Sequence, residues 1–245
     1  MNRTRVLAGC WTILALAALA GCGGDGGGGG GGLTAMRGDA FPFNVGADAR
    51  LPGATITVLE HPERTSVTGA DGHFLFEGLE VGDDATLTLE HPDYHRIQTG
   101  TLRLEVAGAE RVTFQAVNPL TYWGMGLLVG MIPDERNKCQ MVTTVTRVGK
   151  SLYDEGAHGE EGATVTIDPP LPPENGPIYF GSNVLPDPSL TETSDDGGVV
   201  FVQVPPGEYT WTATKPGVRF AQVRMKCRAG WLVNASPPWG LQALD

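Results

Sequence analysis

Two short stretches, PGATITV at residues 52–58 and TSVTGADGHFLF at residues 65–76, establish the fold class of this chain. Apolar and polar residues alternate in the first stretch, as in a β-strand with one buried face, because successive side chains point to opposite faces. The Asp-Gly pair in the second stretch is a turn signal directly before an aromatic strand. The same alternation recurs at residues 85–89 and 112–114. Many short strands separated by turns predict an all-β sandwich.

The same unit returns in the second half of the chain. GATITV at residues 53–58 reappears as GATVTI at residues 162–167, and the Asp-Gly turn reappears at residues 196–197. The two blocks lie further apart in the second copy, where the proline-rich residues 168–189 intervene. We expect this insertion to decorate the surface rather than to form a binding loop, because such connections usually run over the outside of a fold.

The matching residues, from PGATITV to EHPDY in the first copy and from GATVTI to TATKPG in the second, resemble the carboxypeptidase regulatory-like domain. That domain is a small prealbumin-like (transthyretin-like) β-sandwich appended to many secreted proteins, so the resemblance implies a fold and not a function. We therefore expect two tandem Ig-like or prealbumin-like β-sandwiches, domain 1 at residues 41–118 and domain 2 at residues 139–245.

Residues 119–138 are predicted to link the two sandwiches. Their central part, YWGMGLLVGMI at residues 122–132, is apolar on nearly every side and ends at Pro133. It is too short to span a bilayer, and its three glycines weaken a helix. We expect a short helical or irregular plug between the sandwiches. The alternative is an exposed patch that docks a partner or a lipid surface.

Composition excludes two classes of protein. The chain has 17 Lys and Arg against 28 Asp and Glu, a net charge of −11, which argues against a nucleic-acid partner. Hydrophobic residues make up 41% of the chain and charged residues 18%, which excludes an intrinsically disordered protein.

The N-terminus has the parts of a bacterial secretion signal. Arg3 and Arg5 precede an apolar run at residues 6–20, which is shorter than a membrane span. LAGC at residues 19–22 resembles the lipobox of bacterial lipoproteins, in which the signal is cut before the Cys that carries the lipid. An ordinary signal peptide with a chance Cys is the alternative.

A lipoprotein signal predicts the subcellular location of the mature chain. We expect residues 1–21 to be removed, Cys22 to be lipidated, and residues 22–40, with their polyglycine run, to form a tether. The membrane is then a partner through the lipid, and the protein belongs to the bacterial cell envelope. Gly23 after Cys22 favours the outer membrane or the cell surface over the inner membrane.

Cysteine use agrees with export. Cys10 lies in the predicted signal and Cys22 carries the predicted lipid, which leaves Cys139 and Cys227 as an even pair in an oxidising compartment. A metal site is the competing use of two cysteines, but neither has a second Cys or a His nearby at ligand spacing. The sequence therefore predicts a Cys139–Cys227 disulfide.

The candidate metal site is the stretch HPDYH, with His91 and His95 at its ends and His61 as a third ligand. The competing interpretation is a turn in which Tyr94 packs against the core. Intradiol ring-cleavage dioxygenases have a related sandwich core, but they bind iron with a His-x-His pair that this chain lacks. We expect no cofactor and no catalysis, with a metal-binding or redox-accessory lipoprotein as the first alternative and a divergent dioxygenase-like enzyme as the second.

Aromatic side chains near the C-terminus suggest a ligand platform. Tyr209 and Trp211 share one face of a predicted strand, and Trp231 and Trp239 follow in the sequence. Exposed rings of this kind stack on sugars, although core packing competes for them. The sequence thus predicts a non-catalytic, membrane-anchored module for binding, adhesion or structure, with a polysaccharide or an envelope protein as its partner.

Overall fold

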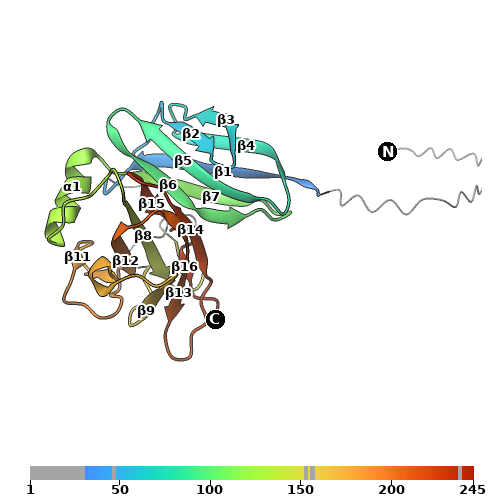
Figure 1. Ribbon diagram of the computed structural model, residues 1–245. Helices are drawn as coiled ribbons and strands as arrows, with labels where there is room; N and C mark the ends of the chain where they lie inside the picture. Colours follow the sequence, from blue (N-terminus) through green and yellow to red (C-terminus); the bar gives the residue numbers. More distant parts are fainter. Residues whose placement is uncertain (1–30, 46–47, 152–153, 155–157, 237–238) are drawn as a thin grey trace, which may run out of the picture. The chain divides into compact units, whose positions relative to one another are not determined.

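The computed structural model describes residues 31–245 apart from 46–47, 152–153, 155–157 and 237–238 (Figure 1). The predicted signal peptide, the predicted lipidation of Cys22 and the first part of the predicted tether lie outside the described residues.

The first half of the described chain is built of β-strands, as its alternating pattern predicts. The strands are β1 (Leu33–Pro42), β2 (Thr55–Val58), β3 (His61–Val67), β4 (His73–Glu80), β5 (Asp84–His91), β6 (Tyr94–Arg103) and β7 (Ala109–Ala116). One sheet has the order β4-β1-β7, and β3-β2-β5-β6 faces it. Their inner faces enclose a core that includes Phe74, Phe114, Ile56 and Leu87. The all-β sandwich is confirmed.

Strand β1 corrects the predicted extent of the tether, which ran to residue 40. Leu33 already pairs with Glu80 on β4, and the strand continues between β4 and β7. Met36 and Ala40 are fully buried in the core. Residues 33–40 are therefore part of the fold, because their apolar side chains complete the first sandwich.

A helix and nine further strands make up the rest of the described chain. They are α1 (Pro119–Leu128), β8 (Cys139–Thr146), β9 (Thr164–Asp168), β10 (Ile178–Phe180), β11 (Pro186–Asp187), β12 (Gly198–Val204), β13 (Gly207–Thr214), β14 (Val223–Cys227), β15 (Leu232–Asn234) and β16 (Leu241–Gln242), with a 3₁₀ turn at Pro173–Asn175. The pairing scheme repeats: β12 and β15 flank β8 as β4 and β7 flank β1, and β13 pairs with β9 and β14.

The predicted disulfide is confirmed. Cys139 at the start of β8 and Cys227 at the end of β14 are bonded, with their Cα atoms 5.7 Å apart. Both residues lie in the second hydrophobic core, which also contains Trp211, Phe201 and Met225.

The two halves are joined by more than the predicted linker. Strand β6 pairs in parallel with β15, with Ile97 opposite Leu232, and one residue of β6 pairs with β14. The Arg224 guanidinium on β14 donates hydrogen bonds of 2.7 and 2.9 Å to the Asp84 carboxylate on β5. Residues 31–245 accordingly form one contact unit.

Candidate functional site

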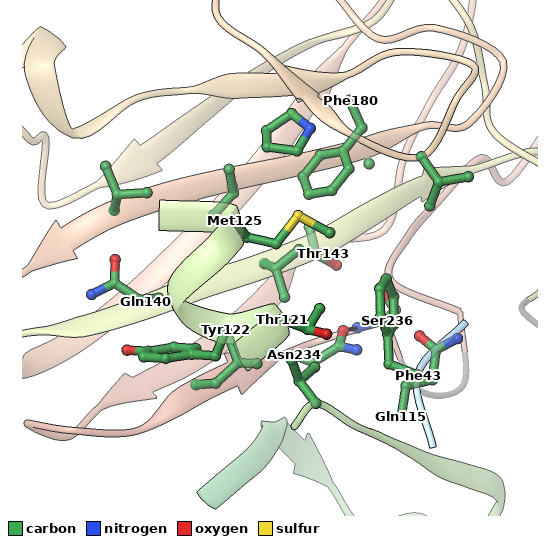
Figure 2. A pocket seen from close by; sticks show the side chains of 18 of the residues that line it. Phe43, Gln115, Thr121, Tyr122, Met125, Gln140, Thr143, Phe180, Asn234 and Ser236 are labelled. Carbon is green, nitrogen blue, oxygen red and sulfur yellow. Dashed lines mark hydrogen bonds between the residues drawn. The ribbon is translucent and has the colours of Figure 1, made fainter. Parts of the chain in front are cut away.

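A cavity of about 260 Å³ lies beneath α1 (Figure 2). Tyr122 and Met125 of α1 cover it, and the outward face of β8, β12 and β15 forms its floor. Phe180 borders it on one side, and Phe43, directly after β1, borders it on another. The cavity is therefore lined by segments from both halves of the fold.

Strand periodicity explains the floor. Along β8, β12 and β15, one set of side chains enters the second core and the alternate set faces the cavity. The core set is Met141, Val145, Val199, Phe201 and Val233. The cavity set is Gln140, Val142, Thr144, Val200, Val202, Leu232 and Asn234. The cavity face is apolar at Val142, Val200, Val202 and Leu232 because α1 and its neighbours cover what would otherwise be an exposed side.

Tyr122 packs the inner side of α1 against β6. Its ring stacks on the imidazole of His95 on β6, with the centroids 3.7 Å apart and the planes 12° from parallel. Burial and, to a smaller extent, the neighbouring Arg96 guanidinium together lower the pKa of His95 to about 4. Burial also raises the pKa of the Tyr122 hydroxyl, as does the nearby Glu135 carboxylate. Both rings are thus held neutral at physiological pH.

Three buried polar atoms on lining residues have no hydrogen-bond partner within the described part of the chain. They are the hydroxyl oxygen of Tyr122, Nε2 of Gln140 and Oγ1 of Thr143. The Gln140 amide is near enough to the Tyr122 hydroxyl to offset part of the rise in its pKa, although the two groups do not meet hydrogen-bond geometry. An unpaired buried polar group typically costs 1–3 kcal/mol, so such groups point to an absent partner.

The outer face of α1 is apolar and faces solvent. Leu120 is 84% exposed, Leu127 67% and Leu128 52%, and the Trp123 ring is partly exposed beside them. The predicted short helix is confirmed, but the expectation of a plug between the halves is incomplete, because the side chains of this outer face remain largely exposed. No helix within residues 31–245, where described, is long and apolar enough to cross a bilayer.

The proline-rich insertion contributes to the site. Its strand β10 pairs with β12, and Phe180, Val184 and Pro186 line the cavity. The expectation of surface decoration is therefore wrong for this part of the insertion. The described lining residues include one carboxyl group, that of Asp196, and burial raises the pKa of this group.

The predicted metal ligands do not form a site. The imidazole of His95 is buried against Tyr122, whereas His91 packs edge-on against Tyr94 in the β5–β6 hairpin. His61 lies beside two carboxylates, 3.7 Å from Glu63 and 3.8 Å from Asp83. Among the described residues, no group of three or more His, Cys, Asp or Glu could hold a metal ion. The HPDYH stretch forms a hairpin turn.

The predicted aromatic platform is not assembled either. Trp211 is fully buried, with its ring edge-on to Phe201 at 4.6 Å between centroids. Tyr209 is buried and its hydroxyl donates to the carbonyl of Pro205. Stacking on a sugar is therefore wrong for both, because β13 turns these side chains into the core.

The remaining two aromatic residues differ. Trp231 is buried, and the guanidinium of Arg228 lies 3.8 Å from its ring centroid, with that of Arg96 at 5.5 Å. Its ring therefore packs with cations and offers no free face to a sugar. Trp239 is partly exposed, and a stacking role for it stays a prediction.

A shared hydrogen-bond pattern marks the repeat. The Thr68 hydroxyl accepts from the Ala54 amide and donates to the Leu51 carbonyl. Thr193 in the second half accepts from the Ala163 amide and donates to the Glu160 carbonyl in the same way.

The two Asp-Gly turns are also alike. Gly72 and Gly197 have φ of +70° and +76°, and a Cβ atom would lie 2.7 Å from the Ala40 carbonyl oxygen in the first turn and 2.3 Å from that of Val145 in the second. Residues 45–117 match the carboxypeptidase regulatory-like domain. The predicted resemblance is thus confirmed for the first copy. A carboxypeptidase regulatory-like second copy stays a prediction, supported by the shared bonding pattern.

Solved structures similar to the chain share little sequence with it. The Bacillus anthracis TIE protein is 14% identical, with a TM-score of 0.29; the match covers 83% of this chain and 33% of that one, so this chain spans about a third of its length. The minor pilin GBS52 of Streptococcus agalactiae is 8% identical (TM-score 0.27; 86% and 95% covered). The shaft pilin SpaA of Lactobacillus rhamnosus GG is 12% identical (TM-score 0.22; 86% and 96% covered). No curated protein sequence matches the chain.

Proposed function

We propose that this protein is a lipid-anchored, non-catalytic module of the bacterial cell envelope that binds a protein partner through the outer face of α1. The lipobox-like LAGC at residues 19–22 supports the anchor. The Cys139–Cys227 disulfide supports export, because such bonds persist in oxidising compartments.

The exposed apolar face of α1 carries this proposal. Contiguous apolar surface on a soluble fold marks an interaction site, since covering it is favourable. A protein partner fits this face better than a membrane does, because α1 contains no Lys or Arg and the chain is strongly acidic. A protein also fits better than a polysaccharide, because the face consists mainly of aliphatic side chains.

The position of α1 suits a tethered binder. Strand β1 starts next to the predicted tether and runs for ten residues, about 30 Å. Phe43, directly after this strand, lines the cavity beneath α1. The exposed face therefore lies at the end of β1 that is remote from the tether, where a partner has room to approach.

Photocrosslinking from α1 in living cells tests the partner. A photoreactive residue in place of Leu127 in the full chain should give one discrete protein adduct. The control is Val106, which is 81% exposed in the turn before β7 and should give no such adduct. Equal adducts from both positions, or none from Leu127, would contradict the proposal.

Cell fractionation tests the anchor separately. Cys22→Ser should release the chain from the membrane fraction, while Cys10→Ser should not. Retention of Cys22→Ser in the membrane after residues 1–21 have been removed, as shown by the mass of the N-terminal peptide, would show that a lipid on Cys22 is not the anchor.

A further inference from the structure

We infer that the cavity beneath α1 binds a small neutral molecule with an apolar body and one carbonyl oxygen, such as an aryl ketone, ester or amide. The inference goes beyond the proposed function, because it concerns the inner side of α1 and a small ligand rather than the outer face and a protein.

Two donors beside each other define the polar end of this ligand. The Oε1 atom of Gln140 accepts a 2.9 Å hydrogen bond from the backbone amide of Gln203, which fixes the side-chain amide. Its Nε2 atom is buried without a partner, and so is the Tyr122 hydroxyl next to it (Figure 2). A carbonyl oxygen has two lone pairs and can accept from both groups.

The surrounding walls define the rest of the ligand. Val142, Val200 and Val202 rise from the floor, and Met125 closes the cavity from α1. A sugar would leave most of its hydroxyl groups unpaired against these side chains, which is costly. The described lining residues include no Lys or Arg, so an anion would enter without a counter-charge.

The volume limits the size of the ligand. A cavity of 150 Å³ lined by aliphatic and aromatic side chains holds benzene, and drug-sized ligands occupy about 300–1,000 Å³. At about 260 Å³, this cavity has room for one ring with a short substituent.

A matched pair of probes tests the inference on the full chain held in lipid nanodiscs. The probes are para-fluoropropiophenone and para-fluoropropylbenzene, which share a skeleton and differ in the carbonyl oxygen. Fluorine NMR line broadening gives the Kd of each. Tyr122→Phe keeps the ring that stacks on His95 and removes one donor. This substitution should raise the Kd of the ketone about tenfold and change the Kd of the hydrocarbon by less than about twofold.

Val200→Phe fills the cavity and should abolish saturable binding of both probes. Val67→Phe, on the exposed surface of β3, is the matched control and should leave both Kd values unchanged. This pair separates cavity binding from partition into the lipid.

Two results would overturn the inference. In one, Tyr122→Phe raises the Kd of both probes equally or of neither, so that the carbonyl plays no part in binding. In the other, Val200→Phe leaves binding intact, so that the cavity is not the site. A discrete crosslink from Leu127 in either case would leave the protein-partner proposal standing.

Discussion

Lowering the pH from 7 to 5 should lower the free energy of unfolding, because the folded protein keeps the His95 imidazole under α1 neutral. The unfolded chain instead protonates this imidazole increasingly as the pH falls. The imidazole lies against the Tyr122 ring, and its nearest carboxylate, that of Glu135, is 4.0 Å away. Burial is the main cause of the low pKa, and the Arg96 guanidinium adds to it.

The size of the effect follows from the two pKa values. His95 titrates at 6.5 when unfolded and at about 4 when folded. Since the folded pKa is the lower one, the unfolded chain binds more protons between these values, and stability falls as the pH decreases through this window. At pH 5 the loss relative to pH 7 is about 2 kcal/mol for a fully enclosed ring. We expect about 1–2 kcal/mol here, because the ring is not completely enclosed.

Urea unfolding followed by tryptophan fluorescence at pH 7 and pH 5 measures this loss. His95→Phe keeps an aromatic ring against Tyr122 and removes the titrating group, so it should lose about 1–2 kcal/mol less than the wild type between the two pH values. His73→Gln changes an exposed histidine on β4 and should lose as much as the wild type. Equal losses in the wild type and His95→Phe would refute the reasoning.

Three further changes test the packing of the fold. Replacing Cys139 and Cys227 together by Ala should lower the free energy of unfolding by about 4 kcal/mol, measured by urea titration, because the bond closes a loop of 88 residues. The Arg224 guanidinium lowers the pKa of Asp84 to about 2, so Asp84→Asn should cost about 0.5–1 kcal/mol at pH 7, discounted for solvent exposure, and the difference from wild type should shrink as the pH falls from 4 toward 2. Trp211→Ala should cost about 4 kcal/mol in thermal or urea unfolding, so any loss of glycan binding in this variant would report unfolding and not a lost contact.

Local patterns in the sequence were sufficient to predict the strands and the disulfide. The alternation at residues 53–58 needs only neighbouring residues, and β2 forms there. The same rule contains a signal against the aromatic platform: Tyr209, Trp211 and Ala213 alternate with polar residues along β13, and all three face the core. Aromatic residues that alternate with polar residues in a strand are thus better predicted to be core residues, unless another observation shows that they are exposed.

The joining of the two halves and the cavity could not be predicted in the same way. The pairing of Ile97 with Leu232 depends on two strands far apart in the chain, and no local pattern specifies it. The cavity is lined by residues of several strands, loops and one helix, from Phe43 to Ser236, and each of these segments looks ordinary by itself. The HPDYH stretch shows the converse, because residues close in sequence point to different neighbours when they form a hairpin.

The place of β1 in its sheet has a mechanical consequence for an anchored protein. A load carried from the envelope would enter the fold at Leu33 and pull along the axis of β1, which is paired over most of its length with β4 on one side and β7 on the other. Such a pull shears both ladders, so their hydrogen bonds share the load and do not open one after another. If the chain is lipid-anchored and α1 binds a partner, as proposed, a pull between the two would load the β1–β4 and β1–β7 ladders in shear.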